Sequence, residues 1–462
     1  MARRGQRALC ISYKESRQVD QTKWKEKRKQ AGREKANRRI SGGLWLTGTL
    51  TALYGLACLY LYYMQSIQPL DYDNRYFQSD LPYHISMIVE DGWYYSFTAY
   101  VYQALYYLCG KTTLGIALFL AAVTVASLLA TELVLRRMAG MQERNWATMA
   151  AALVLNLVMP FYLVWAGSYR YVSYQSGNLW HNSTYLCMRL LGLLVLLYYQ
   201  KLEEDYRDKI TGRQWLAFAL LLVVCTGVKP SFLTVFAPAL ALKLLWDLCH
   251  KVRFKQVFLL GSAVLPACGV VLWQNMVLFG EDTGNGMTYD PWYTFSLHAD
   301  RPKLAVLCSL AFPLVVLGAS LLAVTGQQWR LRGAAREDVW PGGVYQLRLG
   351  RCYLFSWLMA LAGFAEALCL VETGSRSRDG NFLWGYLFAV FWLYVMSLMK
   401  WLSLRNVDIM LLSPEGSPWG RLRLILVRAA YVLAGLVLLY QLWCGTYFFI
   451  RLLGGETYFM MR

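Results

Sequence analysis

Apolar runs of about twenty residues recur along most of this chain, and they constrain its fold more than any other feature. A helix that crosses a membrane needs about 20 consecutive, mainly apolar residues. The composition agrees, because 57% of the residues are hydrophobic and only 16% are charged, whereas soluble domains have about 25% charged residues. The sequence therefore predicts an all-α polytopic membrane protein.

The apolar runs predict about eleven transmembrane helices. The fifth and sixth are short and are separated only by Gly227-Val-Lys-Pro-Ser231, so they form either two tight spans or one broken helix. The predicted spans cover residues 43–64, 112–135, 146–166, 184–200, 214–228, 231–248, 257–279, 304–325, 352–371, 384–402 and 424–445.

Lysine and arginine are unevenly distributed over the predicted connections, and they are normally enriched in cytoplasmic loops. Residues 1–42 contain 14 Lys and Arg against four acidic residues, and the other connections on the same predicted side are also basic. We therefore expect a basic cytoplasmic N-terminal tail that contacts anionic lipid and binds no nucleic acid. A cleavable signal peptide is not expected, because no small-residue cleavage site follows the first apolar run.

This orientation predicts a multi-pass plasma-membrane protein, and the basic tail without a signal peptide favours a bacterial one. The expected parts are the cytoplasmic tail 1–42, the transmembrane domain 43–445 and a short C-terminal tail 446–462, with no appended soluble domain. The predicted outer connections are residues 65–111, 167–183, 280–303 and 372–383.

The large outer loop 65–111 is both acidic and aromatic. Pro82–Asp91 predicts a short helix with Asp80 at its N-terminal boundary. The aromatic run Trp93–Cys109 predicts one or two amphipathic helices that lie in the interface plane.

Five carboxylates lie in this loop, and each is either a solvated group or a general base or metal ligand at the membrane surface. Asp80 is the preferred catalytic candidate, because His84 follows four residues later on the same helix face. The other four carboxylates are Asp71, Asp73, Glu90 and Asp91, of which Asp71 and Asp73 are further catalytic candidates and Glu90 is a binding candidate.

The second outer loop ends in Trp180-His181-Asn182 at the entrance of the fourth predicted span. Asn182 or Ser183 could cap that helix. The alternative is that His181 and Asn182 contact a substrate, and the sequence leaves both interpretations open.

Lys229 lies in a short apolar connection, where a cation is costly and is usually paired or functional. It either extends to the membrane interface or binds a phosphate group. A second predicted cationic group, Arg376 and Arg378, lies in the fourth outer connection, against the charge bias of outer loops. Arginine suits bidentate phosphate binding, and the alternative is a salt bridge to Glu372 or Asp379.

The same connection contains Asn381 and Trp384, and amide, acidic and aromatic groups are what sugar binding uses. Glu372 is therefore also a candidate for substrate binding. Nucleotide-binding and metal-binding motifs are absent from the sequence, and the 11 cysteines are scattered and form no C-x-x-C pair. Few charged residues lie within the predicted spans, among them Glu132, Lys243, Asp247 and Glu366.

The layout of residues 43–445 resembles the integral-membrane glycosyltransferases of the C-type fold. The local resemblance is carried by Asp71-Tyr-Asp73 or by Ser79-Asp80-Leu-Pro-Tyr-His84 in the first outer loop. It implies a catalytic base or metal ligand in that loop and a polyprenyl-phosphate-linked sugar donor. The second outer loop departs from the pattern, because it lacks the further acidic residue that many members carry.

The leading hypothesis is a transferase that moves a sugar from this donor to a glycan, lipid or protein acceptor at the extracytoplasmic face. Asp80 or Asp73 would deprotonate the acceptor, and Lys229, Arg376 and Arg378 would hold the leaving phosphate. No cofactor is required, although a divalent cation would be compatible with the acidic loop. The alternatives are a polysaccharide polymerase or ligase that acts on lipid-diphosphate-linked glycans, and a transporter or flippase.

Overall fold

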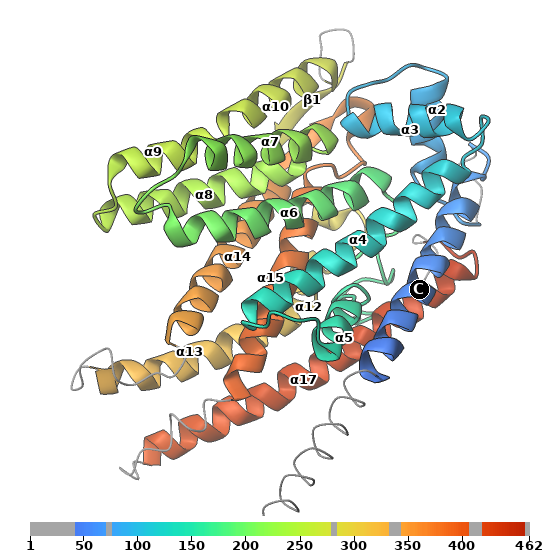
Figure 1. Cartoon of the computed structure of the whole chain (residues 1–462). Coiled ribbons are helices and arrows are strands. Elements are labelled where there is room, and N and C mark those ends of the chain that lie inside the picture. The colour runs from blue at the N-terminus through green and yellow to red at the C-terminus, as the bar shows by residue number, and fades with distance from the viewer. Residues whose placement is uncertain (1–41, 71–75, 279–283, 332–342, 406–417, 458–462) are drawn as a thin grey trace, which may run out of the picture.

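The computed structural model describes residues 42–70, 76–278, 284–331, 343–405 and 418–457, and these residues form a bundle of long helices (Figure 1). A first helix covers Gly42–Ser66. The elements that follow it are α2 (Leu81–Val89), α3 (Phe97–Leu108), α4 (Leu114–Met138), α5 (Trp146–Leu155), α6 (Ser183–Asp205), α7 (Gly212–Val228), α8 (Ser231–Cys249), α9 (Phe254–Ser262), α10 (Leu265–Leu278), β1 (Gly286–Tyr289), α11 (Tyr293–Ser296), α12 (Pro302–Ser309), α13 (Ala311–Leu331), α14 (Gly343–Cys369), β2 (Leu370–Thr373), a 3₁₀ turn (Gly374–Arg376), α15 (Leu383–Leu404) and α17 (Pro418–Leu453).

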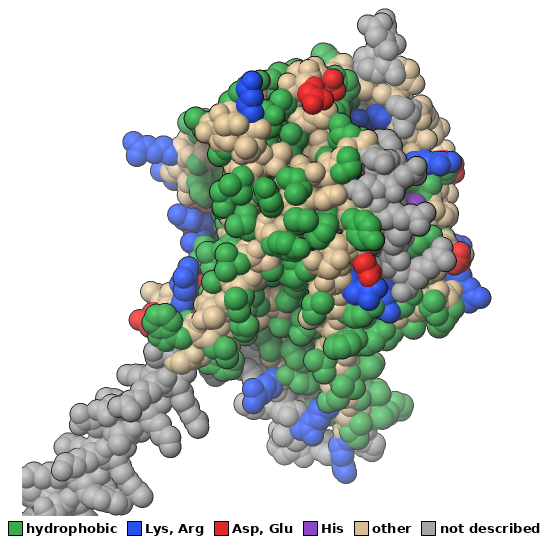
Figure 2. Space-filling view, turned by 90° about the vertical axis from the view of Figure 1, so that its right-hand side faces the viewer, with side chains coloured by type: hydrophobic (Ala, Val, Ile, Leu, Met, Phe, Trp, Pro, Cys, Tyr) green, Lys and Arg blue, Asp and Glu red, His purple; other side chains and the backbone are tan. Residues whose placement is uncertain are grey.

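The prediction of an all-α polytopic membrane protein is confirmed. Within the described ranges, eight helices are long and apolar enough to cross a membrane, or nine if α12 and α13, which meet at 65°, form one span. Large hydrophobic side chains are exposed along these helices. Figure 2 shows them spread over one face of the molecule, with most charged side chains toward its margins. Such a surface suits contact with lipid.

The predicted count of eleven spans differs from these eight or nine helices at two places. The fifth predicted span is α7, which has only 17 residues. The third, residues 146–166, is helical only over α5, and the chain is irregular from residue 156 to residue 182. Pro160 disfavours continuation of the helix, and the Asn178 amide binds the Leu155 and Val158 carbonyls, both at 2.8 Å. The last predicted span, 424–445, lies inside the longer helix α17.

Helices α2 and α3 lie across one end of the bundle, here called the α2–α3 end (Figure 1). The four predicted outer connections meet there. The Ser173 hydroxyl donates to the His298 carbonyl at 2.6 Å, and β1 pairs antiparallel with β2, so that Met287 faces Glu372. The chain therefore returns to this end from several distant parts of the sequence.

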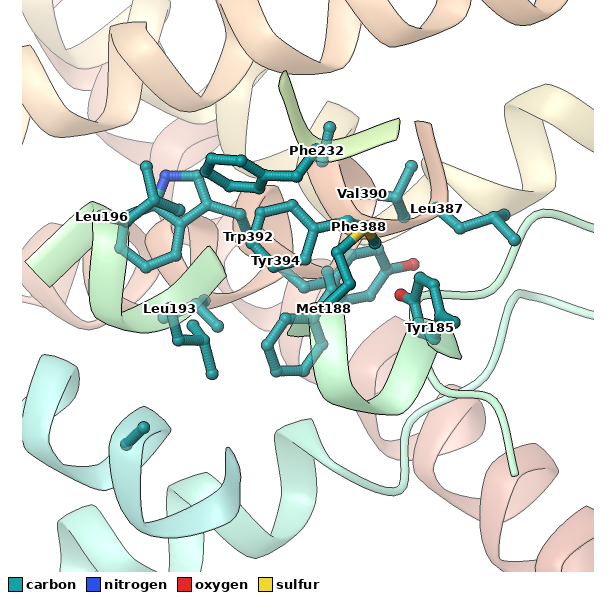
Figure 3. Close-up of a cluster of buried hydrophobic side chains, with 14 of the residues drawn as sticks. Tyr185, Met188, Leu193, Leu196, Phe232, Leu387, Phe388, Val390, Trp392 and Tyr394 are labelled. Carbon is teal, nitrogen blue, oxygen red and sulfur yellow. The ribbon is translucent and has the colours of Figure 1, made fainter. Parts of the chain in front are cut away.

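The core lies between α6, α8, α14 and α15. Helices α8, α14 and α15 pack against one another, and Tyr199 of α6 contacts Phe236 of α8 and Phe355 of α14. Figure 3 shows aromatic and aliphatic side chains from three of these helices in contact, among them Met188, Phe232, Phe388 and Trp392. Gly385 allows the close approach of α15 to α8, because a Cβ atom there would lie 2.4 Å from the Ser231 carbonyl oxygen. This packing fixes the starts of α6, α8 and α15 relative to one another at the α2–α3 end.

Arg189 is a further charged residue inside the predicted spans, in addition to the four named above. Arg189 of α6 is only 1% exposed. Its guanidinium donates to the Asn178 side chain at 2.9 Å and to the Asn156 side chain at 3.1 Å. Arg189 therefore fastens the irregular segment 156–182 to α6, and buried charges are normally satisfied by such bonds.

Candidate functional site

Asp80 precedes the first turn of α2, as the sequence predicted, and Pro82 lies within that turn. An aspartate at this position usually accepts a hydrogen bond from the helix backbone. Asp80 makes no such capping bond. Its Oδ2 atom instead accepts a bond from the Asn182 side-chain nitrogen at 2.7 Å, so the carboxylate is directed toward the start of α6.

Asn182 connects the acid to the rest of the site. It caps α6, as predicted, because its Oδ1 atom accepts from the Tyr185 backbone N–H at 2.9 Å. The same Oδ1 atom accepts a bond from the Thr184 hydroxyl at 3.0 Å. Since Asn182 is 4% exposed, its orientation is fixed by these bonds. Asn182 therefore caps α6, as predicted, and the same side-chain amide also bonds Asp80 and Lys229.

Lys229 follows the last residue of α7 and approaches Asn182 from the side opposite Asp80. Its ammonium group donates to the Thr184 hydroxyl at 3.0 Å and to Asn182 Oδ1 at 3.5 Å. The ammonium also lies 4.7 Å from the ring centroid of Trp384, a cation–π distance. Burial lowers the pKa of Lys229 to about 8, while Asp80 acts in the opposite direction.

The position of Lys229 depends on the packing of α3 against the end of α7. A Cβ atom at Gly227 would lie 2.3 Å from the Phe97 ring, so a larger residue there would separate the two helices. The Ser96 hydroxyl, which precedes α3, donates to the Val228 carbonyl at 2.7 Å. This bond satisfies a carbonyl at the end of α7 and holds the adjacent lysine near α6.

Two histidines complete the inner wall of the site. His84 Nδ1 lies 2.9 Å from the Ser183 hydroxyl oxygen, and the His181 ring lies 5.9 Å from that of Trp384. Burial lowers the pKa of both histidines, while Asp80 opposes this shift and Lys229 adds to it. Both imidazoles are therefore expected to be neutral near pH 7 and able to donate and accept hydrogen bonds.

Trp384, Asn381, Glu372 and Arg376 form a chain of contacts on the other side of Lys229. The Trp384 indole N–H donates to the Asn381 side-chain oxygen at 3.1 Å, and the Asn381 amide donates to Glu372. Arg376 Nε lies 3.3 Å from Glu372 Oε1. Arg376 therefore forms the salt bridge to Glu372 that was the alternative to phosphate binding. Glu372 is 6% exposed, and it orients both Arg376 and Asn381.

The remaining predicted site residues are not part of this cluster. Glu90 lies at the other end of α2, is exposed and accepts a bond from the Ser86 hydroxyl at 2.6 Å. Arg378 is exposed. Asp71 and Asp73 lie outside the described residues.

Ser183 and Thr184 were not among the predicted binding residues, although they contact His84 and Lys229. The available signal was their place in the first turn of a capped helix, where hydroxyl groups commonly occur. That signal identifies a capping motif and does not indicate which distant side chains meet it.

No group of three or more His, Cys, Asp and Glu residues gathers closely enough to hold a metal ion within the part of the chain that the structure describes. Asp80 there contacts an amide, and it interacts electrostatically with His84, His181 and Lys229. The arrangement instead suits hydrogen bonding to a hydroxyl group near Asp80 and to an anion near Lys229.

No protein-family model matches the sequence, and no curated protein matches it. Among solved structures, the chain is similar to the archaeal oligosaccharyltransferase AglB from Archaeoglobus fulgidus, in complex with an inhibitory peptide and a dolichol-phosphate. The TM-score is 0.31 and the sequence identity is 14%, over 87% of this chain and 56% of that chain. This chain thus spans little more than half the length of that protein, and at this TM-score the similarity defines neither family nor activity.

Proposed function

We propose that this protein is a membrane glycosyltransferase that moves a sugar from a polyprenyl-phosphate-linked donor to an acceptor at the extracytoplasmic face. The observation that carries the proposal is the pair of opposite charges joined through Asn182. Asp80 and Lys229 contact the two ends of one amide, at 2.7 Å and 3.5 Å. A carboxylate and a cation held close, but not in direct contact, can serve two different groups of one reaction.

Asp80 would act as the general base. Its carboxylate has no ion pair among the described residues, and the hydrogen bond that it accepts from Asn182 leaves lone pairs for an acceptor hydroxyl. Transfer of that proton to Asp80 would accompany formation of the bond between the acceptor oxygen and the sugar C1 atom. The bond between C1 and the phosphate oxygen would break, and inversion at C1 would follow.

Lys229 would stabilise the departing lipid phosphate. Its pKa of about 8 leaves it mainly protonated at pH 7, and an ammonium beside the leaving oxygen offsets the developing negative charge. The Thr184 hydroxyl and the Trp384 ring hold the lysine in place. A lipid phosphate as leaving group needs no nucleotide, in agreement with a sequence that has no nucleotide-binding motif.

His84, His181, Asn381 and Trp384 would orient the sugar or acceptor. Neutral imidazole and amide groups can bond sugar hydroxyls, and an indole ring offers an apolar face to the pyranose C–H groups. Arg376, held by Glu372, would add positive charge on the donor side, and Arg378 would contact the lipid phosphate from the surface.

The test is sugar transfer by the purified full chain, using a polyprenyl-phospho-sugar donor and a set of acceptors. Asp80→Asn and Lys229→Gln should each abolish most of the transfer. Asp91→Asn and Lys303→Gln are matched controls, because both groups are exposed and lie in the predicted outer loops. The proposal fails if the two site variants keep the activity of their controls.

The products distinguish this function from the alternatives. Transfer of a single sugar with release of a lipid monophosphate supports the proposal. Release of a lipid diphosphate with a longer glycan would indicate a polymerase or ligase, and movement of substrate across proteoliposomes without a covalent product would indicate a transporter.

A further inference from the structure

A cavity lies at the end of the bundle opposite the α2–α3 end. It has a volume of about 100 Å³ and is lined by α6, α8, α14 and α15. Gln200, on its wall, lies eighteen residues beyond Asn182 on α6, which corresponds to roughly 27 Å along a helix. The cavity is therefore separate from the candidate transferase site.

The cavity wall changes from apolar to charged along two helices. On α6, Leu196 is followed by Tyr199 and Gln200, and then by Glu203. These positions are three or four residues apart and so share one helix face. Helix α14 runs antiparallel to this direction. Toward the same end of the bundle its wall residues are therefore Leu358, then Leu354, then Arg351. A molecule with a polar head and an apolar chain matches this gradient.

Buried polar groups on the wall lack partners. The Tyr199 hydroxyl, both amide atoms of Gln200 and the Trp392 indole nitrogen have no hydrogen bond within the described ranges. Tyr199 is 4%, Gln200 5% and Trp392 1% exposed. Native proteins rarely leave buried polar atoms unpaired, because each one costs stability. All three side chains can donate a hydrogen bond, so an occupant with acceptor oxygens would satisfy these donors.

The charges at the mouth of the cavity favour an anion. Lys243 and Arg207 both bind Asp247, at 2.7 Å and 2.8 Å. Arg351 lies 3.5 Å from Glu203, which also faces Lys243 at 3.7 Å. Three cations thus face two carboxylates. The side chains of Arg207 and Arg351 remain 46% exposed and can accept another anionic partner.

The rim of the cavity is apolar where it meets the exposed surface. Trp246 and Leu354 border the cavity, and they are 65% and 61% exposed. Both lie on membrane-length helices, so they would contact acyl chains rather than water. A ligand can therefore enter sideways from the bilayer.

We propose that this cavity binds one anionic phospholipid, with its phosphate beside Arg207 and Arg351 and one acyl chain against the apolar wall of α6 and α14. The phosphate or glycerol oxygens would accept from Tyr199 and Gln200. This site does not depend on the proposed transferase activity.

The test is binding of phosphatidylglycerol to the full chain after removal of lipid in detergent, followed by native mass spectrometry and thermal unfolding. Wild-type protein should retain one lipid and unfold at a higher temperature when it is bound. The double variant Arg207→Gln/Arg351→Gln should weaken binding about tenfold or more, as expected for the loss of charge-assisted bonds.

Two further variants keep the result interpretable if the double variant is unstable. Gln200→Leu should raise the unfolding temperature of lipid-free protein, since it removes an unpaired amide, and yet weaken lipid binding. Arg348→Gln is the matched control, because Arg348 lies on the same helix, pairs with Glu204 at 2.8 Å and does not line the cavity. It should bind lipid as wild type does.

Three results would overturn the proposal. Binding by Gln200→Leu equal to wild type would mean that the polar wall contacts no lipid. A loss in Arg348→Gln as large as that in the double variant would indicate a general charge effect. Equal stabilisation by glycerol 3-phosphate would indicate a soluble phosphate instead of a lipid.

Discussion

Asp80 and Lys229 at one end of the helix bundle are paired differently from Asp247 at the other end. At the α2–α3 end, Asp80 and Lys229 are joined only through the neutral amide of Asn182. At the opposite end, Asp247 is bound directly by Lys243 at 2.7 Å and Arg207 at 2.8 Å, and the Tyr206 hydroxyl donates to it as well. The same helices, α6 and α8, contribute to both ends.

This difference indicates that the charged groups at the α2–α3 end are available for a reaction, whereas those at the opposite end stabilise the fold. A charge that is bound only by a neutral group retains interactions for a ligand, and at the α2–α3 end both signs are available. At the opposite end the carboxylates are used by the protein itself, and the groups left over are neutral polar atoms and the exposed parts of two arginines. Reactivity is therefore expected at the first end, and binding without chemistry at the second.

The largest effect is expected from Asp80→Asn. Asparagine keeps the shape of the side chain and can still bond Asn182, so folding should be preserved. Loss of a general base lowers rates by about 10²–10⁴-fold, and we expect a decrease of that size in kcat for sugar transfer. Asp91→Asn, measured in parallel, should stay near the wild-type rate. Wild-type kcat in Asp80→Asn would remove the base from the proposed site.

In contrast to Asp80→Asn, Asp247→Ala should cause a large loss of folding stability and no direct loss of kcat. Asp247 is 1% exposed, and breaking a buried ion pair from one side typically costs about 3–5 kcal/mol. The free energy of unfolding, measured in detergent, should fall by this order, whereas any loss of transfer should follow the loss of folded protein. A variant that folds normally but transfers no sugar would contradict the division between the two ends.

The pH dependence should also distinguish the site lysine. The ordinary pKa of a lysine is 10.5, and burial lowers that of Lys229 to about 8. As pH rises through 8 the folded protein loses this charge, so donor affinity should fall by up to tenfold per pH unit. Between about 8 and 10.5 the unfolded chain binds more protons than the folded one, so this group makes the folding stability rise with pH.

The two measurements for Lys229 therefore change in opposite directions above pH 8. Lys229→Gln removes both effects, and it serves as the control in KM and thermal-unfolding profiles. If Lys229→Gln kept the wild-type dependence of KM on pH, another group would have to bind the donor phosphate.

The smallest effect is expected from substitutions of Asn182, which both caps α6 and bonds Asp80. Asn182→Ala should lower the free energy of unfolding by about 1 kcal/mol, through loss of the α6 cap. Asn182→Ser should keep most of that stability, because serine caps helices well, but it lacks the amide that bonds Asp80. Reduced kcat in both variants, with reduced stability only in the alanine variant, would separate positioning of the acid from capping. Equal kcat in Asn182→Ser and wild type would show that the amide is not needed.

Local patterns in the sequence were enough to predict several parts of this site. The proline in the first turn indicated that α2 begins after Asp80, and the polar residue before an apolar run indicated that Asn182 caps α6. Both depend on residues within one helical turn. The roles of Asp80, Lys229 and the other site residues remain predictions.

Other features depend on residues far apart in the chain. Glu372, which pairs with Arg376, lies in β2, and the partner strand of β2 is β1, far earlier in the chain. Helix α5 ends before the predicted position, and this end is held by Asn178, more than twenty residues after Leu155, whose amide binds the Leu155 and Val158 carbonyls. No periodicity in the sequence indicates such bonds.

The sequence by itself determined that this chain is a helical membrane protein, because burial of apolar runs in lipid requires only their length and composition. It also determined where the helices that bear Asp80 and Asn182 begin, because capping is local. Only the tertiary structure decided that Asp80 meets Lys229 through Asn182, and that Gln200 and Arg351 line a common cavity. These contacts depend on how α6, α7, α8 and α14 pack, and packing is a property of the surfaces of several helices together.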